Sequence, residues 1–257
     1  MSAAGKAPTI LYADQEHSGL RLAIFIALFI GYLAGFVTVS LLLGAFASPD
    51  IADYSLFLSC VGGVPFALVI IWGLEKILKR VWHSGLSLTL DDRGLFVNDR
   101  RANSKTDESE APAMVWSAHL NQINWYFRLK GYPRGGRERR VPSKWLGVAT
   151  EVQQDDARLN VYALMPPEAA AVWTENHKLK FHYLNVAELY DSTMRAKIGP
   201  PSRPTIDNHL LQSRDGRYWL AERRRWEYGI ELTPDDFATL MRYVADAQQT
   251  EATLSNN

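Results

Sequence analysis

The sequence predicts a membrane α-helical hairpin followed by an α+β domain, in which an antiparallel β-meander precedes C-terminal helices. Three observations lead to this prediction: two long apolar segments at 22–46 and 54–74, alternation of apolar and polar residues after residue 84, and amphipathic stretches opened by proline near the C-terminus. The expected parts are an N-terminal segment (1–21), the hairpin with its basic exit (22–83), a β-rich domain (84–180), and a region that completes or adds to that domain (181–257).

Each apolar segment is long enough to cross a bilayer. A helix rises about 1.5 Å per residue, so the segments reach roughly 37 and 31 Å against a hydrocarbon core of about 30 Å. Backbone groups in hydrocarbon must pair within the segment, which leaves the helix as the expected conformation. Neither segment contains Asp, Glu, Lys, Arg or His. An ion pathway or proton relay through the hairpin alone is therefore not expected.

Positive charge flanks the outer ends of the hairpin and is absent from its tip. The tip, 47–53, carries Asp50 and Asp53 but no Lys or Arg. The flanking basic residues are Lys6, Arg21, Lys76, Lys79 and Arg80. Because positive loops stay in the cytoplasm, we expect a multi-pass protein of the inner (cytoplasmic) membrane, with the N-terminus and the C-terminal domain in the cytoplasm. A small-residue sequence near Ala47 is also compatible with signal cleavage, but the apolar region is far longer than that of a signal peptide.

Small residues recur at four-residue intervals in both apolar segments. Ala27, Gly31 and Gly35 share one face of the first expected helix, and Ser59 and Gly63 share one face of the second. Such spacing allows another helix backbone to approach closely. Two interpretations remain open: the two helices pack on each other, or the small faces support oligomerisation or docking on a larger membrane complex.

The region after residue 84 has the alternation of a β-meander. Apolar residues occur at every second position in 86–90 and 123–129, and a turn sequence at 91–94 precedes the run 95–97. Two more apolar runs, 145–152 and 159–165, are separated by the polar turn 153–156. The polar stretch 100–113 is expected to be a loop. Together these features predict about five to seven strands.

The C-terminal region is expected to mix helices with one more hairpin. Helices are predicted over 166–177, where prolines precede an acid, and over 186–197, before the proline-rich stretch 199–204. A β-hairpin is predicted to turn at 214–216, with Arg223–Arg225 on a salt-bridged edge strand. Thr233 is the expected cap of a terminal helix whose apolar face includes Phe237 and Leu240.

Composition excludes several classes of function. The formal net charge is zero, so no basic field suggests nucleic acid as a partner. The only cysteine, Cys60, lies in the second apolar segment and leaves no partner for an intrachain disulfide or a Cys-based zinc site. The sequence has no His-Glu-x-x-His, phosphate-binding glycine loop or Gly-x-Ser-x-Gly. We therefore expect no catalytic residue, no metal and no cofactor.

One basic cluster is a candidate contact for anionic lipid headgroups or phosphate. Its members are Arg134, Arg137, Arg139, Arg140 and Lys144. Each basic residue near an anionic leaflet contributes about 1 kcal/mol, so several together hold a tethered domain at the surface. The alternative is a solvated loop whose arginines pair with acids elsewhere.

These features resemble bacterial pleckstrin-homology-like membrane proteins. The resemblance rests on the strand–turn–strand of 88–90 and 94–97, followed by 115–117 and Ile123, behind a membrane hairpin. It covers 84–177, departs from the family in spacing because of two extra residues and the long polar loop, and leaves the region after 178 unexplained. It implies scaffolding or binding and no catalytic residues.

The expected function is a membrane-anchored, non-enzymatic binding or scaffold module. The alternatives are an accessory or assembly subunit of a larger membrane complex, and a membrane-bound enzyme whose site assembles from scattered residues. The expected partners are the lipid bilayer, anionic lipid headgroups, and other membrane proteins or a second copy of the chain.

Overall fold

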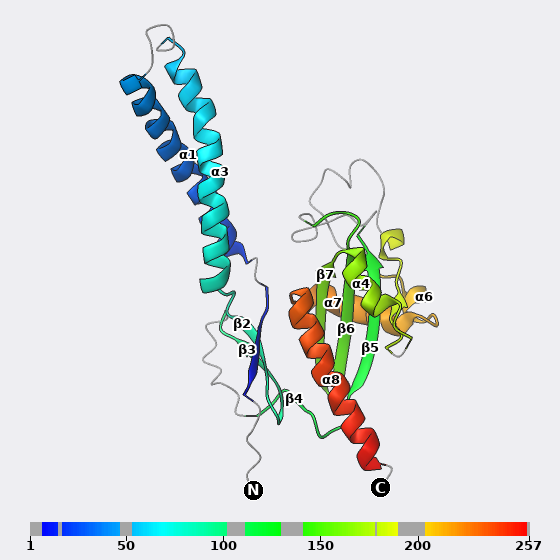
Figure 1. Cartoon of the computed structure of the whole chain (residues 1–257). Helices are drawn as coiled ribbons and strands as arrows, with labels where there is room; N and C mark the ends of the chain where they lie inside the picture. Colours follow the sequence, from blue (N-terminus) through cyan, green and yellow to red (C-terminus); the bar gives the residue numbers. More distant parts are fainter. Residues whose placement is uncertain are drawn as a thin grey trace. The chain divides into compact units, whose positions relative to one another are not determined.

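The computed structural model describes residues 7–14, 17–46, 53–101, 111–129, 141–177, 179–189 and 204–255. The chain forms two compact units (Figure 1). One is the segment Gln15–Ser84, and the other combines Met1–Asp14 with Gly85–Asn257. We refer to them as the hairpin unit and the sheet unit.

The hairpin unit consists of the helices α1 (Ser18–Phe46) and α3 (Ser55–Val81), which lie side by side (Figure 1). Both are long and apolar enough to cross a membrane, as the sequence predicts. Both extend beyond the expected bounds, because α1 begins before Leu22 and α3 continues through the basic stretch that ends in Lys79 and Arg80. Lys79 Nζ pairs with Glu75 Oε1 one turn earlier at 2.7 Å, which supports this added helical turn.

The first sheet of the sheet unit has the order β1-β2-β3-β4, with all neighbours antiparallel. Its strands are β1 (Thr9–Tyr12), β2 (Leu86–Leu90), β3 (Gly94–Asp99) and β4 (Met114–Val115). Strands β2 and β3 form the predicted hairpin, and Asp91 Oδ1 accepts the N–H groups of Arg93 and Gly94 in its turn, both at 2.9 Å. Strand β1 was not predicted. It precedes the apolar helices in sequence, yet it pairs with the strand that follows them.

The second sheet has the order β8-β5-β6-β7-β9. The antiparallel meander β5 (Asn121–Arg128), β6 (Leu146–Gln154) and β7 (Ala157–Met165) agrees with the predicted alternation. The short outer strands β8 (His182–Tyr183) and β9 (Ile230–Glu231) run parallel to their neighbours and were not predicted.

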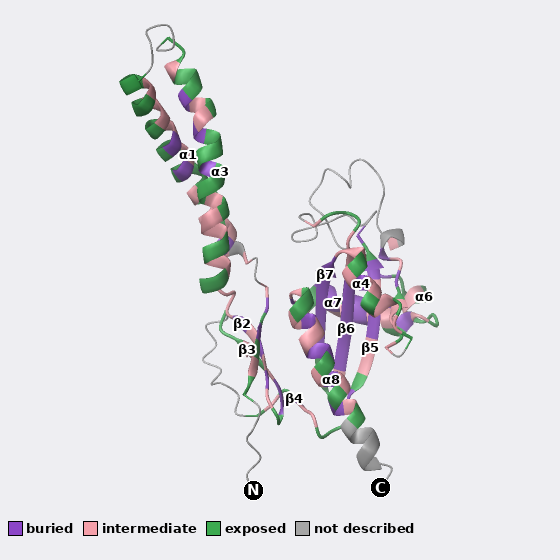
Figure 2. Cartoon of the chain, viewed as in Figure 1, coloured by how far each residue is buried: buried purple, intermediate pink, exposed green. Residues whose placement is uncertain are grey.

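Helices cover both faces of the second sheet. The terminal helix α8 (Pro234–Ser255) and α4 (Pro167–Thr174) contribute to one hydrophobic core, which also includes the inner face of the first sheet. Thr233 Oγ1 accepts the N–H of Asp236 at 3.1 Å, so the predicted cap is present. The second core lies against the opposite face of the meander, under α7 (Gly216–Tyr228). Figure 2 shows the buried residues of β5, β6 and β7 between these layers.

The hairpin and the edge strand predicted for the C-terminal region were wrong. The expected β-hairpin around 214–216 and the edge strand with Arg223–Arg225 are replaced by α6 (Asn208–Leu211) and α7. Trp219, Glu222 and Trp226 are buried at spacings of three and four, which is the period of a helix face rather than of a strand. The helix expected over 186–197 is a 3₁₀ helix over Val186–Leu189, and the remainder lies outside the described residues.

Candidate functional site

The small residues predicted for helix packing line the contact between α1 and α3. A Cβ atom added to Gly35 would lie 2.7 Å from Phe66 Cβ and 3.0 Å from the carbonyl oxygen of Gly63. A Cβ atom on Gly63 would lie 3.1 Å from the backbone nitrogen of Phe36, and one on Gly31 would lie 3.4 Å from Ala67 Cα. The backbones approach so closely because these positions lack side chains.

The remaining members of this set extend the same contact. Ser59 is buried on α3, where its Oγ donates to the carbonyl of Ser55 at 2.7 Å. Ala27 is half-buried, one turn before Gly31. Ala67 is also buried but was not in the predicted set, although Ser59, Gly63 and Ala67 follow the same four-residue spacing. We call this contact the helix seam.

Away from the helix seam, much of both helices is exposed (Figure 2), and the exposed residues include many large apolar ones. Phe29 and Leu33 of α1 are 56% and 60% exposed, and Leu68 and Val69 of α3 are 59% and 70% exposed. Contiguous apolar surface of this extent is rare on a protein surrounded by water, so it indicates an apolar environment or a covering partner.

His17 links the start of α1 to the residue that follows α3. His17 Nδ1 accepts the N–H of Leu20 in the first turn of α1 at 3.3 Å, and Nε2 lies 3.1 Å from the carbonyl oxygen of Trp82 after α3. An accepting Nδ1 places the proton on Nε2, which then donates to Trp82. The imidazole ring of His17 and the indole ring of Trp82 also meet edge-on, with centroids 5.3 Å apart.

In the sheet unit, a pocket of about 380 Å³ lies beside the first half of β5. Strand β8 pairs only with Trp125 and Tyr126 of β5, so it does not reach this part of the strand. The pocket is lined by 120–124, by Leu179 and Lys180 before β8, by Arg217 and Tyr218 of α7, and by Gln248 of α8. We call it the β5-edge pocket.

A chain of side-chain hydrogen bonds forms the floor of the β5-edge pocket. Gln122 Nε2 donates to Thr150 Oγ1 at 3.2 Å, Thr150 Oγ1 donates to Asn124 Oδ1 at 2.8 Å, and Asn124 Nδ2 donates to the carbonyl of Leu179 at 2.9 Å. Thr150 and Asn124 are buried. The network therefore fixes the orientation of both amide groups and attaches the Leu179 segment to the sheet.

The rim of the β5-edge pocket carries two cations in different settings. Arg217 Nη2 donates to the hydroxyl of Tyr218 at 2.6 Å, and its guanidinium lies 4.6 Å from the centre of that ring. Tyr218 in turn stacks on His182, with ring centroids 4.0 Å apart and planes at 11°, and His182 Nε2 lies 3.5 Å from Asp215 Oδ1. Lys180 is exposed and adopts a positive φ of 45°.

No described carboxylate pairs with Lys180 or Arg217. None of the ten residues lining the β5-edge pocket is Asp or Glu. Within the part of the chain that the structure describes, neither Lys180 nor Arg217 forms an ion pair with a carboxylate. The pocket is therefore positively charged in a unit whose sequence is neutral overall.

Three charged residues of α7, Glu222, Arg224 and Arg225, serve packing instead of forming an open site. Glu222 accepts the indole N–H groups of Trp125 and Trp226, both at 2.7 Å, and pairs with the guanidinium of Arg225 at 2.7 and 2.8 Å. On the same face, Glu151 accepts from Arg224 and, at 2.6 Å, from Asn160. Both carboxylates are fully buried. They hold α7 on the meander and are out of reach of a substrate.

The environment of Arg224 raises the pKa of its guanidinium. Burial lowers the pKa of its guanidinium, but the hydrogen bonds and charge of Glu151 outweigh that effect, and the pKa of Arg224 is raised. The ion pair with Glu151 therefore favours the charged form of Arg224.

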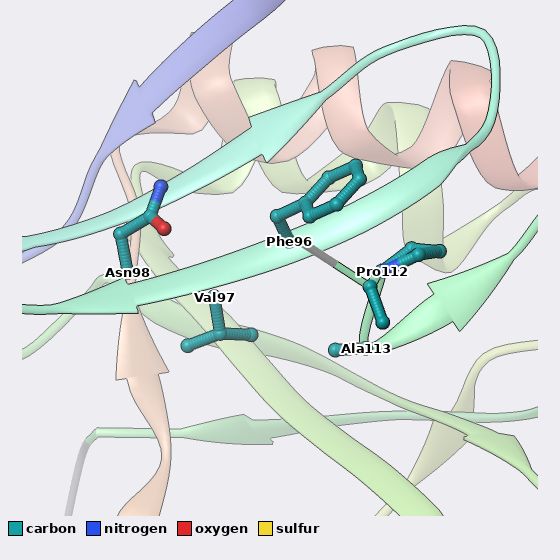
Figure 3. Close-up of a pocket in the computed structure, with 6 residues that line it drawn as sticks. Phe96, Val97, Asn98, Pro112 and Ala113 are labelled. Atoms are coloured by element: carbon teal, nitrogen blue, oxygen red, sulfur yellow. The ribbon is translucent and has the colours of Figure 1, made fainter. Parts of the chain in front are cut away.

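A second, smaller hollow of about 130 Å³ lies beside β3 and is lined by 96–98 and 111–113. Figure 3 shows Phe96 and Asn98 on one side of the strand and Val97 on the other, with Pro112 and Ala113 alongside. None of its lining residues is titratable. It has neither the volume nor the charge of the β5-edge pocket.

The predicted basic cluster is only partly within the described residues. Lys144 is exposed shortly before β6, whereas Arg134, Arg137, Arg139 and Arg140 lie outside the described residues. Among the described residues, no group of three or more His, Cys, Asp or Glu side chains is arranged to hold a metal ion.

The residues of the β5-edge pocket were not identified from the sequence. Asn124, Lys180 and Arg217 come from a strand, a connecting segment and a helix that was predicted to be a hairpin. No local spacing marks them, since the pocket exists only after the chain has folded. No family model, curated protein or solved structure matches this chain.

Proposed function

We propose that this protein is a membrane-anchored, non-enzymatic binding module. In this proposal α1 and α3 cross the membrane and the sheet unit is displayed at its cytoplasmic face. The observation that carries the proposal is the distribution of side chains on the helices. Small residues fill the helix seam, and large apolar residues such as Phe29 and Val69 face outward. A bilayer matches such a surface over the uncharged parts of the two helices, 22–46 and 55–74.

The pairing of β1 with β2 supports two crossings. Thr9–Tyr12 precedes α1 and Leu86–Leu90 follows α3, and the two strands share one sheet. Strands of one sheet occupy one compartment, so a chain that leaves through α1 must return through α3. The side of the membrane on which the sheet unit lies is proposed from charge. The charged residues of the tip 47–53 are all acidic, whereas Lys76, Lys79 and Arg80 lie at the other end of α3.

The pleckstrin-homology-like fold remains part of the proposal. It is supported by an antiparallel sheet and an antiparallel meander that share a core with a C-terminal helix, α8. Strands β8 and β9, which pair in parallel, and helix α7 on the opposite face would be additions to such a fold. Binding is the role that this arrangement favours, because a polar pocket is open at a sheet edge and the buried acid of α7, Glu222, is used in packing.

The glycines of the helix seam give no support to the subunit alternative. Gly31, Gly35 and Gly63 are in contact across α1 and α3, so they do not provide a free face for another membrane protein. Docking on a larger complex would have to use the outward apolar faces instead.

Cysteine labelling tests the proposed topology. In a Cys60→Ser background, a single cysteine is introduced at Asp53, near the tip, or at exposed Lys144. In intact bacterial cells stripped of their outer membrane, an impermeant maleimide should label position 53, and position 144 should react only after the membrane is opened. The protein should stay in the membrane fraction at alkaline pH. Labelling of both positions from the same side, or extraction into the soluble fraction, would contradict the proposal.

A further inference from the structure

We propose that the β5-edge pocket binds the phosphate monoester group of a small ligand. The inference rests on the binding function proposed above and names the chemistry that the module recognises. The ligand is either a soluble phosphate ester or a lipid whose headgroup is a phosphate monoester, because both present the same group to the pocket.

Charge is the first argument. Lys180 and Arg217 both line the pocket, and none of the ten lining residues is acidic. A phosphate monoester carries a charge of about −1.5 to −2 at neutral pH. It is therefore a closer match to two cations than a single carboxylate is, and a neutral ligand would leave both cations uncompensated.

The second argument is that the arginine is held in position before any ligand arrives. Tyr218 accepts a hydrogen bond from Arg217 Nη2 at 2.6 Å, and Tyr218 is itself stacked on His182. The guanidinium has five N–H donors, so a bond to Tyr218 leaves others for phosphate oxygens. A cation that is already ordered loses less conformational freedom on binding. This arrangement explains why an exposed arginine lies against an aromatic ring at the mouth of a pocket.

The floor of the pocket supplies the third argument. The amides of Gln122 and Asn124 are fixed by the chain through Thr150, and the pocket is about 380 Å³ in volume. This volume lies at the lower end of the range for small-molecule sites, about 300–1,000 Å³. Gln122 Nε2 also donates to Met241 Sδ at 3.4 Å, so both of its N–H groups are used and its carbonyl oxygen is the group it offers to a hydroxyl of the ligand. The pocket thus suits a small polar molecule with one phosphate group.

Titration calorimetry on the full-length protein in phosphatidylcholine nanodiscs tests this inference. The titrants are glycerol phosphate, glycerol and acetate. Glycerol phosphate should bind with one-to-one stoichiometry, and glycerol and acetate should give no comparable binding. No heat from glycerol phosphate, or equal affinity for acetate, would overturn the inference.

The matched variants are Arg217→Gln and Lys180→Gln, with Arg223→Gln as the control. Arg223 is exposed on the same helix and does not line the pocket. Each pocket variant should weaken glycerol phosphate binding at least tenfold, and the control should leave it unchanged. Circular dichroism should show that all three variants keep the wild-type melting profile. A folded Arg217→Gln protein with unchanged affinity would overturn the inference.

Nanodiscs that contain phosphatidic acid separate the two sources of phosphate. If the lipid headgroup fills the pocket, glycerol phosphate binding should be lost in these discs and restored by phosphatidylcholine. If the ligand is soluble, the affinity should be the same in both discs. Either result supports the phosphate site. The cysteine-labelling topology does not depend on these titrations, so failure of the ligand assignment is distinguishable from failure of the membrane anchor.

Discussion

Ala13 donates its backbone N–H to the carbonyl oxygen of Leu86 at 3.0 Å, although the whole of α1 and α3 separates the two residues in sequence. This bond continues the antiparallel ladder of β1 and β2. The hairpin unit is therefore an insertion between two adjacent strands of one sheet. The sheet unit does not end where the helices begin, since Leu11 and Ala13 are both buried in its core.

Excision of the hairpin unit should leave a soluble sheet unit. Replacing residues 15–84 by Asn-Gly joins Asp14 to Gly85 through a two-residue turn of the kind that favours antiparallel pairing. We expect this variant to be monodisperse without detergent and to unfold cooperatively, as seen by size-exclusion chromatography and circular dichroism.

A chain that begins at Gly85 is the control for this excision. It lacks β1 and therefore the buried side chains of Leu11 and Ala13. Loss of one buried leucine side chain costs about 2–5 kcal/mol, and the truncation also exposes the edge of β2. We expect it to aggregate or to melt at a clearly lower temperature. Equal stability of the two chains would show that β1 does not belong to the sheet.

Substitution of Gly35 by valine should open the helix seam. The added side chain meets Phe66 and the backbone of Gly63, and such overpacking costs about 1–3 kcal/mol. Cross-linking of a Tyr32→Cys variant to the natural Cys60 measures the effect, because the Tyr32 ring lies 3.3 Å from where a Cβ atom of Gly63 would be, one turn after Cys60. We expect Gly35→Val to reduce the yield of the α1–α3 cross-link several-fold.

Gly44→Val is the matched control for the helix seam. A Cβ atom at Gly44 meets nothing within 4 Å, so the same change of residue adds no clash. The cross-link yield should equal that of the parent protein. A similar loss in both variants would assign the effect to helix propensity and not to the seam.

Substitution of Glu222 by glutamine should destabilise the sheet unit strongly. The side chains of Glu222 and Arg225 are both fully buried, so loss of the carboxylate removes an ion-pair partner from a charge inside the core. Breaking one partner of a buried ion pair costs about 3–5 kcal/mol. Urea unfolding of the full-length protein in detergent, followed by tryptophan fluorescence, should show this loss. Glu227→Gln on the exposed side of α7 should change the free energy of unfolding by less than about 0.5 kcal/mol.

The sequence predicts the elements whose hydrophobic period is strong. The alternation in 123–129 and 159–165 matches β5 and β7, and Thr233 marks the start of α8. The apolar segments predict α1 and α3, because length and absence of charge are local properties. Element bounds were less accurate, since the basic end of α3 continues the helix.

Other features depend on contacts between distant parts of the chain. β1 has only four residues, and the strand that stabilises it lies beyond the two helices. α7 begins at Gly216, and the sequence 214–216 between apolar residues has the pattern of a hairpin turn, which favoured a strand interpretation. The spacing of Trp219, Glu222 and Trp226 was the available signal for a helix, but the burial of Glu222 depends on Trp125 in another strand.

The turn between β2 and β3 should make part of the stability depend on pH. Burial raises the pKa of the Asp91 carboxyl, but the N–H groups of Gly94 and Arg93 and the Arg93 guanidinium outweigh this, and the pKa is lowered. A carboxyl with a lowered folded-state pKa binds protons more weakly in the folded state than in the unfolded state. Its contribution to stability is therefore complete above the ordinary aspartate pKa of about 3.9 and is lost as the pH falls through the lower, folded-state value.

Comparison with Asp91→Ala isolates this contribution. The variant removes the acceptor for the N–H groups of Arg93 and Gly94, so it should be less stable than the wild type at pH 6. The difference in the free energy of unfolding should shrink as the pH is lowered from about 5 to about 2, because the wild type loses its advantage on protonation. Asp92→Ala, at an exposed position in the same turn, should show no such convergence. A difference that stays constant with pH would mean that Asp91 acts through its shape and not through its charge.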